Sequence, residues 1–216
     1  HSEEMFEQQK QFIGNASHEI QTPLAICQNR LEMLMEDETL SEQQMGEIAK
    51  TCQTLEYVSK LNKSLLLLSK IDNSQFASVE KVCLNEILYR YLDDYQEVYD
   101  YKGITLDVHE KNTFNITMNG TLAVVLITNL LKNAFVHNIY KGKIQIEITS
   151  SNIRFGNTGK DEHLDEKHIF ERFYQGSKKE GSTGLGLAIV DAICRQSQLS
   201  IQYQFVKGWH WFDISC

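Results

Sequence analysis

Apolar residues recur at alternating spacings of four and three through the first part of the chain, from position 13 to position 34. This spacing places them on one side of an α-helix, so the sequence predicts an amphipathic helix that ends near Glu36. A polar connection follows, and Ser41 at its end is suited to cap a second helix. The first apolar row consists of Ile13, Ser17, Ile20, Leu24, Cys27, Leu31 and Leu34.

The same spacing continues from Met45 to Leu68 and predicts a second helix that ends near Asn73. Two helices joined by a short connection form a hairpin, and a hairpin alone buries little apolar surface. We therefore expect a second copy of the chain to complete a dimeric four-helix bundle. The apolar row stops after Asn73, which predicts a helical domain over residues 1–74 and a second domain over residues 75–216.

Residues 75–216 mix short segments of alternating polarity with longer apolar-periodic segments. The alternating segments predict strands at 80–84, 104–109, 114–118, 143–150, 152–155, 199–206 and 209–214. The longer segments predict helices at 85–103, 121–137 and 184–197. Asn85 and either Asn119 or Thr121 are expected as N-caps, and Gly103 as a left-handed ending. Strands and helices do not alternate strictly, so we expect an α+β sandwich with a mixed sheet covered on one face.

Composition narrows the class of protein. The formal net charge of −8 argues against a nucleic-acid partner held on a basic surface. Five cysteines are scattered without a Cys-x-x-Cys pair, which predicts reduced and buried thiols. No apolar run reaches the ~20 residues that cross a bilayer. The chain opens inside an amphipathic helix without a start signal, so we expect it to be part of a longer protein.

A glycine-rich run from Gly181 to Leu187 opens the predicted helix at 184–197. The backbone N–H groups of such a loop, together with the N-terminal end of the helix, can hold phosphate groups. No strand directly precedes the loop, and the run lacks the Lys-Ser/Thr ending of a P-loop, so neither common nucleotide-binding motif fits. Taken alone, the run is equally consistent with a plain glycine-rich loop.

Asn129 and Asn133 lie one turn apart on the predicted helix at 121–137, with His137 one further turn along. An amide oxygen is a hard neutral ligand, which suits a Mg²⁺ ion already bound by triphosphate oxygens. Two solvated amides on a helix are the alternative interpretation, and for Asn129 alone they are the better one.

His18 lies beside the apolar row of the first helix and is expected to be partly exposed. A neutral imidazole there can attack a γ-phosphorus in line, and Glu19 can orient the ring or take the released proton. Thr22, one turn along, can position a water molecule for hydrolysis. Pro23 removes a backbone hydrogen bond and is expected to loosen the helix locally. A single histidine on an amphipathic helix is, however, more often a surface or core residue.

Four segments resemble, in this order and spacing, the H, N, F and second G boxes of bacterial two-component sensor histidine kinases. They are His18 to Leu24, Asn129 to Asn133, Ile169 to Tyr174 and Gly181 to Leu187. The resemblance covers nearly the whole chain, from about residue 6 to residue 216. It implies a dimerisation and histidine-phosphotransfer hairpin followed by a catalytic ATP-binding sandwich of the gyrase-like (GHKL, Bergerat) type.

The resemblance implies a role for individual residues. His18 would be the phosphoacceptor, Glu19 its acid/base partner, and Thr22 the residue for phosphatase activity. Phe170 and Phe173 would anchor a lid over ATP. Asn133 would bind Mg²⁺. The residues expected to bind or enclose ATP are Asn129, Asn133, His137, Asn157, Gly159, Phe170, Phe173, Gly184, Leu185 and Gly186.

The chain departs from the family pattern at the adenine end. The first G box normally reads Asp-x-Gly-x-Gly, whereas the nearest match here is Asn157-Thr158-Gly159, which lacks the second glycine. Asn157 retains an acceptor oxygen for the adenine amino group through its amide. Val136 and Gln21 stand where the family usually has basic residues. These departures bear on ATP affinity more than on the fold.

We therefore expect the cytoplasmic core of a sensor histidine kinase, anchored to a membrane only through an N-terminal part outside this chain. It would autophosphorylate His18 from ATP with Mg²⁺, pass the phosphoryl group to an aspartate of a response regulator, and also act as the regulator's phosphatase. Two alternatives stay open. One is a nucleotide-weak or inactive kinase that serves as a regulator-binding or phosphatase module. The other is a gyrase-like ATPase, which needs a glutamate where this chain has Asn129.

Overall fold

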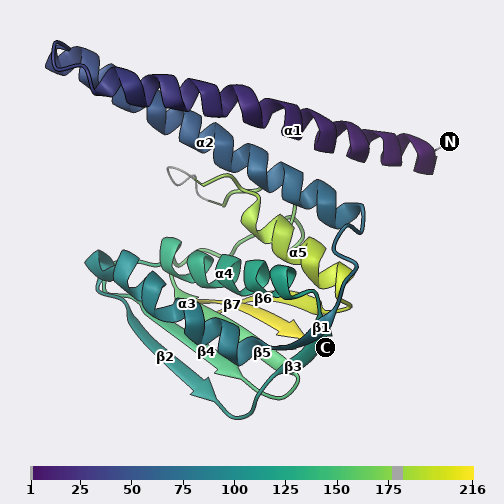
Figure 1. Ribbon diagram of the computed structural model, residues 1–216. Helices are drawn as coiled ribbons and strands as arrows, with labels where there is room; N and C mark the ends of the chain where they lie inside the picture. Colours follow the sequence, from purple (N-terminus) through teal and green to yellow (C-terminus); the bar gives the residue numbers. More distant parts are fainter. Residues whose placement is uncertain (1, 177–181) are drawn as a thin grey trace.

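The computed structural model describes residues 2–176 and 182–216 and consists of a long helical hairpin on a sheet domain (Figure 1). The hairpin is formed by α1 (Ser2–Met35) and α2 (Glu42–Asp72), which end within one residue of the predicted positions. Ser41 caps α2 as predicted, because its Oγ accepts from Gln44 N–H while the Gln44 side chain accepts from Ser41 N–H.

Polar side chains of α2 hold backbone carbonyl groups of α1 inside the hairpin. The buried Asn62 donates through Nδ2 to the carbonyl oxygen of Ser17 at 2.6 Å, and Ser69 Oγ donates to that of Lys10 at 3.1 Å. A Cβ at Gly14 would lie 2.7 Å from Ser69 Oγ, so the glycine lets the two helices approach closely. These contacts fix the register of the two helices in the first half of α1.

The predicted apolar row of α1 is only partly covered in one chain. Ser17 is buried, whereas Ile20, Cys27 and Leu34 are exposed. Further apolar side chains exposed on the hairpin are Met5, Phe12, Ile26, Met33, Met35 and Tyr57. Such a surface is what a bundle-forming hairpin leaves for other helices to cover. Within the part of the chain that the structure describes, no helix combines the length and apolarity needed to cross a membrane.

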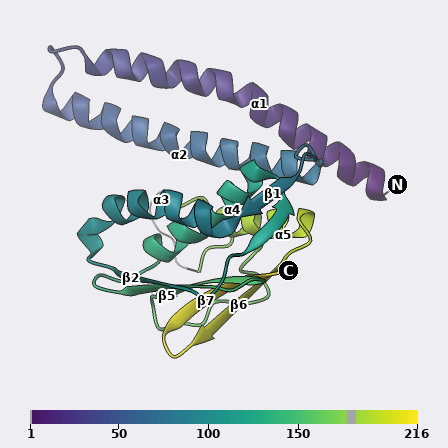
Figure 2. The same ribbon diagram turned by 60° about the horizontal axis from the view of Figure 1, so that its bottom comes forward.

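The second domain is built on a mixed five-stranded sheet in the order β2-β4-β5-β7-β6. β2 and β4 pair in parallel, and the other neighbours are antiparallel. The helices α3, α4 and α5 lie on one face of this sheet (Figure 2), which confirms the predicted α+β sandwich. A separate two-stranded sheet pairs β1 with β3. The elements are β1 (Glu80–Cys83), α3 (Leu84–Val98), η1 (Asp100–Lys102), β2 (Thr105–Glu110), β3 (Asn115–Met118), α4 (Gly120–Val136), β4 (Lys143–Ile148), β5 (Asn152–Thr158), α5 (Gly186–Gln196), β6 (Ser200–Val206) and β7 (Trp209–Ser215).

The apolar core fills the space between the sheet and its helices. Ile146 and Phe155 from the sheet and Leu130 from α4 are each at most 1% exposed. The end of α2 belongs to the same core, because Leu68 and Ile71 are 2% and 3% exposed there and α2 packs against α5. The hairpin and the sheet domain are therefore joined by buried apolar contact and not only by the connecting chain.

The predicted N-cap of α3 is wrong. The helix begins at Leu84, and Asn85 lies inside its first turn with 3% of its surface exposed. Its Nδ2 donates to Glu110 and to the carbonyl oxygen of Asn112, and its Oδ1 accepts from Phe114 N–H at 2.9 Å. Asn85 therefore connects α3 to the segment between β2 and β3. Its local sequence does not indicate this role.

The cysteine prediction holds only in part. All five cysteines are free, but Cys27 and Cys216 are exposed and Cys194 alone is buried. Burial raises the pKa of the Cys194 thiol to about 12, because desolvation disfavours the thiolate. Apolar neighbours in the sequence do not imply burial on a helix whose apolar row faces solvent in a single chain.

Candidate functional site

The start of α5 lies against the middle of α4. Asn129 Nδ2 donates to the carbonyl oxygen of Val125 at 2.8 Å, which holds its amide group close to the helix. A Cβ at Gly186 would lie 3.3 Å from Asn129 Oδ1, so only a residue as small as glycine leaves this approach open without adjustment. Two segments that are more than fifty positions apart in the sequence, the predicted N and G boxes, are thereby brought together.

Asn133 and His137 continue the same side of α4 toward its end. The Asn133 side chain is half-buried and forms no hydrogen bond with any residue in the described ranges, so its amide oxygen remains available to a ligand. His137 follows the helix as its C-cap, and its backbone N–H donates to the Asn133 carbonyl oxygen at 3.1 Å.

Lys102 stabilises the end of α4 and was not identified from the sequence. Its Nζ donates to the carbonyl oxygens of Phe135 and Val136 at 2.9 and 3.0 Å. Burial lowers the pKa of Lys102, and its positive charge complements the negative end of the helix dipole. The contact joins residues more than thirty positions apart, so no local sequence pattern predicts it.

Asn157, at the end of β5, is 2% exposed. Its Nδ2 donates to the carbonyl oxygen of Thr158 at 2.9 Å. A carbonyl oxygen only accepts, so the amide nitrogen must face it and Oδ1 must face away. Among the described residues, no donor reaches this Oδ1. A nearly buried acceptor without a protein donor fits the amino group of a bound base.

A second polar group, which the sequence did not identify, holds the segment after Asn157 against the end of α4. Asn138 is 5% exposed; its Oδ1 accepts from Thr158 Oγ at 2.8 Å, and its Nδ2 donates to the carbonyl oxygen of Lys143 at 3.0 Å. A Cβ at Gly159 would lie 3.1 Å from the carbonyl oxygen of His137. Asn138, which directly follows His137, therefore positions the predicted adenine-binding segment.

The two phenylalanines predicted to anchor a lid are held in different ways. The half-buried ring of Phe170 packs edge-on against Phe212 of β7, with ring centroids 6.4 Å apart. Phe173 is 56% exposed, and its backbone N–H donates to the carbonyl oxygen of Gly184 at 2.9 Å. The Phe170 ring thus connects the loop to the sheet, and the Phe173 N–H connects it to the segment just before α5. Gly181 of the predicted box lies outside the described residues.

Gly184→Ala is expected to weaken the hydrogen bond from Phe173 N–H to the carbonyl oxygen of residue 184, whereas Gly208→Ala is expected to leave it intact. Both glycines have a positive φ, of 71° and 81°, so each substitution costs about 1–2 kcal/mol in backbone conformation. A Cβ at Gly184 would also lie 3.0 Å from backbone atoms of Phe173, while nothing lies within 4 Å at Gly208. Hydrogen exchange of the Phe173 amide measures the difference. Equal protection of that amide in both variants would contradict the proposed anchor.

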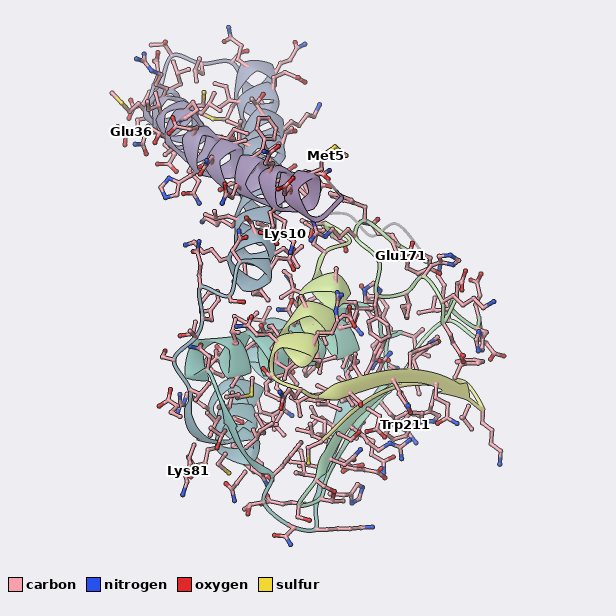
Figure 3. The ribbon with its side chains drawn as sticks, turned by 90° about the vertical axis from the view of Figure 1, so that its right-hand side faces the viewer. Met5, Lys10, Glu36, Lys81, Glu171 and Trp211 are labelled. Atoms are coloured by element: carbon pink, nitrogen blue, oxygen red, sulfur yellow. The ribbon has the colours of Figure 1, made fainter. Side chains whose placement is uncertain are left out.

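His18 and Glu19 lie apart from these residues. Their side chains and that of Thr22 are exposed on α1, which continues through Pro23 without interruption. α2 lies between α1 and the sheet domain (Figures 1 and 2), and the view from the side has the same order (Figure 3). One chain in this arrangement therefore brings Asn129 to Gly186 and Phe173 to Gly184 but does not bring α1, which carries His18, to them.

A cleft marks the junction between the hairpin and the loop that carries Phe170. Arg172 Nη2 and Asp72 Oδ2 form an ion pair at 2.7 Å across this junction. The cleft holds about 450 Å³ and is lined by Leu68, Asp72, Phe170, Glu171, Arg172, Ala188, Ala192 and Arg195. None of the predicted asparagines lines it, so it is a feature of the domain junction.

The donor set of the described residues bears on metal binding. Over residues 2–176 and 182–216, no three His, Cys, Asp or Glu side chains are grouped so that they could hold a metal ion. A divalent cation at Asn133 would therefore need most of its ligands from phosphate oxygens and water. That requirement fits Mg²⁺ carried by a nucleotide, which keeps several non-protein ligands.

Comparison with known families assigns the two halves separately. Residues 8–74 match the family model of the His Kinase A (phospho-acceptor) domain. Residues 118–210 match that of the histidine kinase-, DNA gyrase B-, and HSP90-like ATPase. The two matches follow each other in the order that the sequence motifs predicted.

Known relatives and solved structures agree with these matches. The chain is 34% identical over 187 residues to the heme sensor protein HssS of Staphylococcus epidermidis, covering 84% of this chain and 41% of that protein. HssS of Staphylococcus aureus is 32% identical over 200 residues, with 89% and 43% covered. The chain thus spans about two fifths of the length of these relatives.

Among solved structures, full-length ShkA in complex with AMPPNP has a TM-score of 0.70 and 18% identity, covering 95% of this chain and 46% of that one. The Acinetobacter baumannii histidine kinase AdeS has a TM-score of 0.61 and 23% identity, covering 91% and 95%. These likenesses show that the hairpin and sheet domain share their fold with histidine kinase cores.

Proposed function

Because this chain belongs to the two-component sensor histidine kinases, we propose that it transfers the γ-phosphoryl group of ATP to His18 and then to an aspartate of a response regulator. We also propose that it removes the phosphate from that regulator, and that the division between its two domains falls at residue 74. The observation that carries the proposal is the meeting of Asn129 with Gly186, beside the free amide oxygen of Asn133.

The nucleotide is bound between α4, α5 and the end of β5. Asn157 Oδ1 accepts from the amino group of adenine; guanine presents an acceptor at that position, so the site selects ATP over GTP. Asn129 and the backbone N–H groups that open α5 hold phosphate oxygens. Asn133 would hold Mg²⁺ through its amide oxygen, and a bound Mg²⁺ would neutralise charge on the phosphates.

The hairpin supplies the acceptor and the hydrolytic groups. The exposed imidazole of His18 attacks the γ-phosphorus, the bond from that phosphorus to the β–γ bridging oxygen breaks so that ADP leaves, and Glu19 accepts the proton that leaves the ring. Thr22 holds a water molecule during dephosphorylation of the regulator. Since α2 separates α1 from the sheet domain in one chain, transfer requires either that this domain leaves its docked position or that it serves a second copy. The exposed Ile20, Cys27 and Leu34 form the dimer contact.

Incubation of the chain with γ-labelled ATP and Mg²⁺ tests the proposed activity. A phosphohistidine is labile in acid and stable in base, so we expect label that acid removes and alkali does not. Label that survives acid treatment, or none at millimolar ATP, would contradict the proposal.

Titration with nucleotide separates the kinase from the binding-module alternative, which Asn157 and Val136 motivate. We expect saturable ATP binding that strengthens with Mg²⁺ and weaker binding of GTP. A chain that binds a response regulator but no nucleotide at millimolar concentration would instead favour the module.

A further inference from the structure

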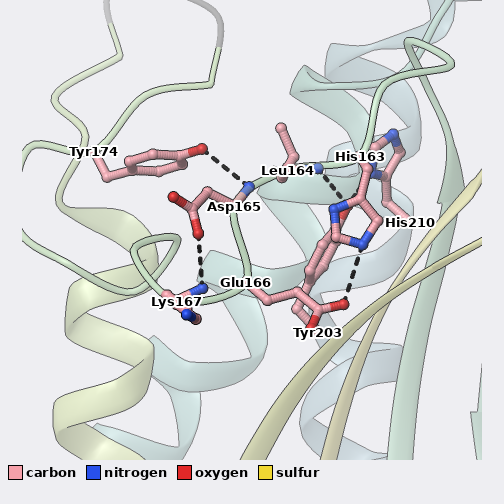
Figure 4. A network of polar contacts seen from close by, with 8 residues as sticks. All are labelled: His163, Leu164, Asp165, Glu166, Lys167, Tyr174, Tyr203 and His210. Carbon is pink, nitrogen blue, oxygen red and sulfur yellow. Dashed lines mark hydrogen bonds and ion pairs between the residues drawn. The ribbon is translucent and has the colours of Figure 1, made fainter.

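Two buried side chains at the edge of the sheet hold the loop that follows Asn157. Tyr203 of β6 and His210 of β7 are each 7% exposed. Tyr203 Oη lies 2.7 Å from His210 Nδ1, and His210 Nε2 lies 2.9 Å from the carbonyl oxygen of Lys160. Leu164 N–H donates to Tyr203 Oη at 3.3 Å (Figure 4). A network of three hydrogen bonds thus reaches the loop at two points, the Lys160 carbonyl oxygen and Leu164 N–H.

The direction of each hydrogen bond in this network follows from the available donors and acceptors when the His210 ring is neutral. The Lys160 carbonyl oxygen can only accept, so His210 Nε2 carries the proton and donates to it. In the neutral ring Nδ1 is then an acceptor, and Tyr203 O–H donates to it. Burial raises the pKa of Tyr203, so the phenol keeps this proton at neutral pH. Tyr203 Oη in turn accepts from Leu164 N–H, so every polar group in this hydrogen-bond network has a partner.

The same pair adjoins the predicted adenine-binding segment. His210 is paired directly with Asn157 in the antiparallel β5–β7 ladder, which puts their side chains on the same face of the sheet. A Cβ at Gly159 would lie 3.0 Å from His210 Cδ2, so the imidazole ring is packed against the backbone just after Asn157. The strand register and the loop contacts therefore converge on one short segment, residues 157–164.

We propose that Tyr203 and His210 are positioning residues for nucleotide recognition. They hold the backbone at Lys160 and Leu164, and thereby keep Asn157 Oδ1 and Gly159 facing the base. This inference rests on the proposed nucleotide-binding function. Neither residue belongs to a motif box.

Tyr203→Phe tests the proposal, because it keeps the ring and removes only the hydroxyl group. We expect the KM for ATP in autophosphorylation, and the Kd for ADP, to rise about tenfold while kcat stays within about twofold. Tyr89→Phe is the matched control: its hydroxyl group is bound to Glu110 near the opposite edge of the sheet, so its KM and Kd should equal those of the parent chain. A residue that only fills the core would change stability without this split between KM and kcat.

His210→Gln is the second variant and is expected to change KM in the same direction. If the two side chains act together in one hydrogen-bond network, the double variant should bind ATP no more weakly than the single variant with the higher Kd. Independent and additive losses would overturn the common role. Should one variant fail to fold, the other still supplies the KM and Kd.

Hydrogen exchange in the nucleotide-free protein separates this inference from the proposed function. The amide of Leu164 should exchange faster in Tyr203→Phe than in Tyr89→Phe, whether or not ATP is the ligand. Faster exchange with unchanged KM and Kd would overturn the positioning role and leave the kinase function intact. Unchanged exchange would overturn the contact itself, and a parent chain that binds no nucleotide would overturn both.

Discussion

His18→Gln is expected to abolish acid-labile labelling of the chain by γ-labelled ATP, a loss of at least about 10³-fold. Glutamine keeps a polar, uncharged side chain but has no ring nitrogen that can attack phosphorus. Because His18 is exposed and its side chain has no hydrogen bond within the described part of the protein, the substitution removes no structural contact there. The free energy of unfolding, measured by thermal denaturation, should therefore stay within about 0.5 kcal/mol of that of the parent chain.

His109→Gln is the control for this experiment. His109 is also exposed, but it lies on β2, away from the hairpin, and its replacement should leave the labelling intact. The Kd for ATP should equal that of the parent chain in both variants, since His18 lies on α1 and α2 lies between α1 and the domain with the proposed nucleotide-binding residues. Equal labelling of His18→Gln and the parent chain would show that another residue accepts the phosphoryl group.

The helical hairpin and the strands could be predicted because their signals are local. Spacings of three and four define α1 and α2, and the Ser41 capping box fixes where α2 begins. Asn85 had the same local appearance as a cap, yet a partner from the β2–β3 connection, Phe114 N–H, decides its place. A sequence window shows the capping preference of an asparagine but not a hydrogen bond to a residue that is distant in the chain.

The candidate site divides in the same way. Asn129, Asn133 and Asn157 stand in recognisable motifs, so their positions could be predicted, and the structure places Asn129 against Gly186. The supporting contacts could not be predicted, because each joins separate elements: Lys102 with the end of α4, and Asn138 with Thr158. The groups proposed to bind the ligand belong to short motifs, whereas the residues that hold them in place depend on the completed fold.

His210 shows that one such residue left a weak signal in the sequence. The alternating strand predicted over 209–214 puts His210 on the face opposite Trp209 and Trp211, and the structure confirms a strand there, with His210 on the covered face. The alternation alone does not tell which face of the strand is covered, so the need of His210 for hydrogen-bond partners becomes evident only when the structure places it on the covered face. These partners are Tyr203 and the carbonyl oxygen of Lys160.

Asn133→Ala is expected to reduce the rate of autophosphorylation about 100-fold and to raise the Mg²⁺ concentration needed for half-maximal rate. The amide oxygen is the one protein ligand assigned to the metal ion, so its removal leaves the cation held by the nucleotide and water alone. Stability should not fall, because this side chain has no hydrogen bond to lose among the described residues and alanine favours a helix more than asparagine does.

Two further variants complete this test. Asn115→Ala removes an exposed asparagine on β3, outside the predicted site, and should leave both the rate and the Mg²⁺ dependence unchanged. Asn133→Asp restores an oxygen ligand and should recover part of the rate at high Mg²⁺, since a carboxylate also suits this ion. If Asn133→Ala kept a rate within about twofold of the parent chain, Asn133 would not be a metal ligand. The amide on α4 would then be the solvated side chain that its position on a helix surface equally allows.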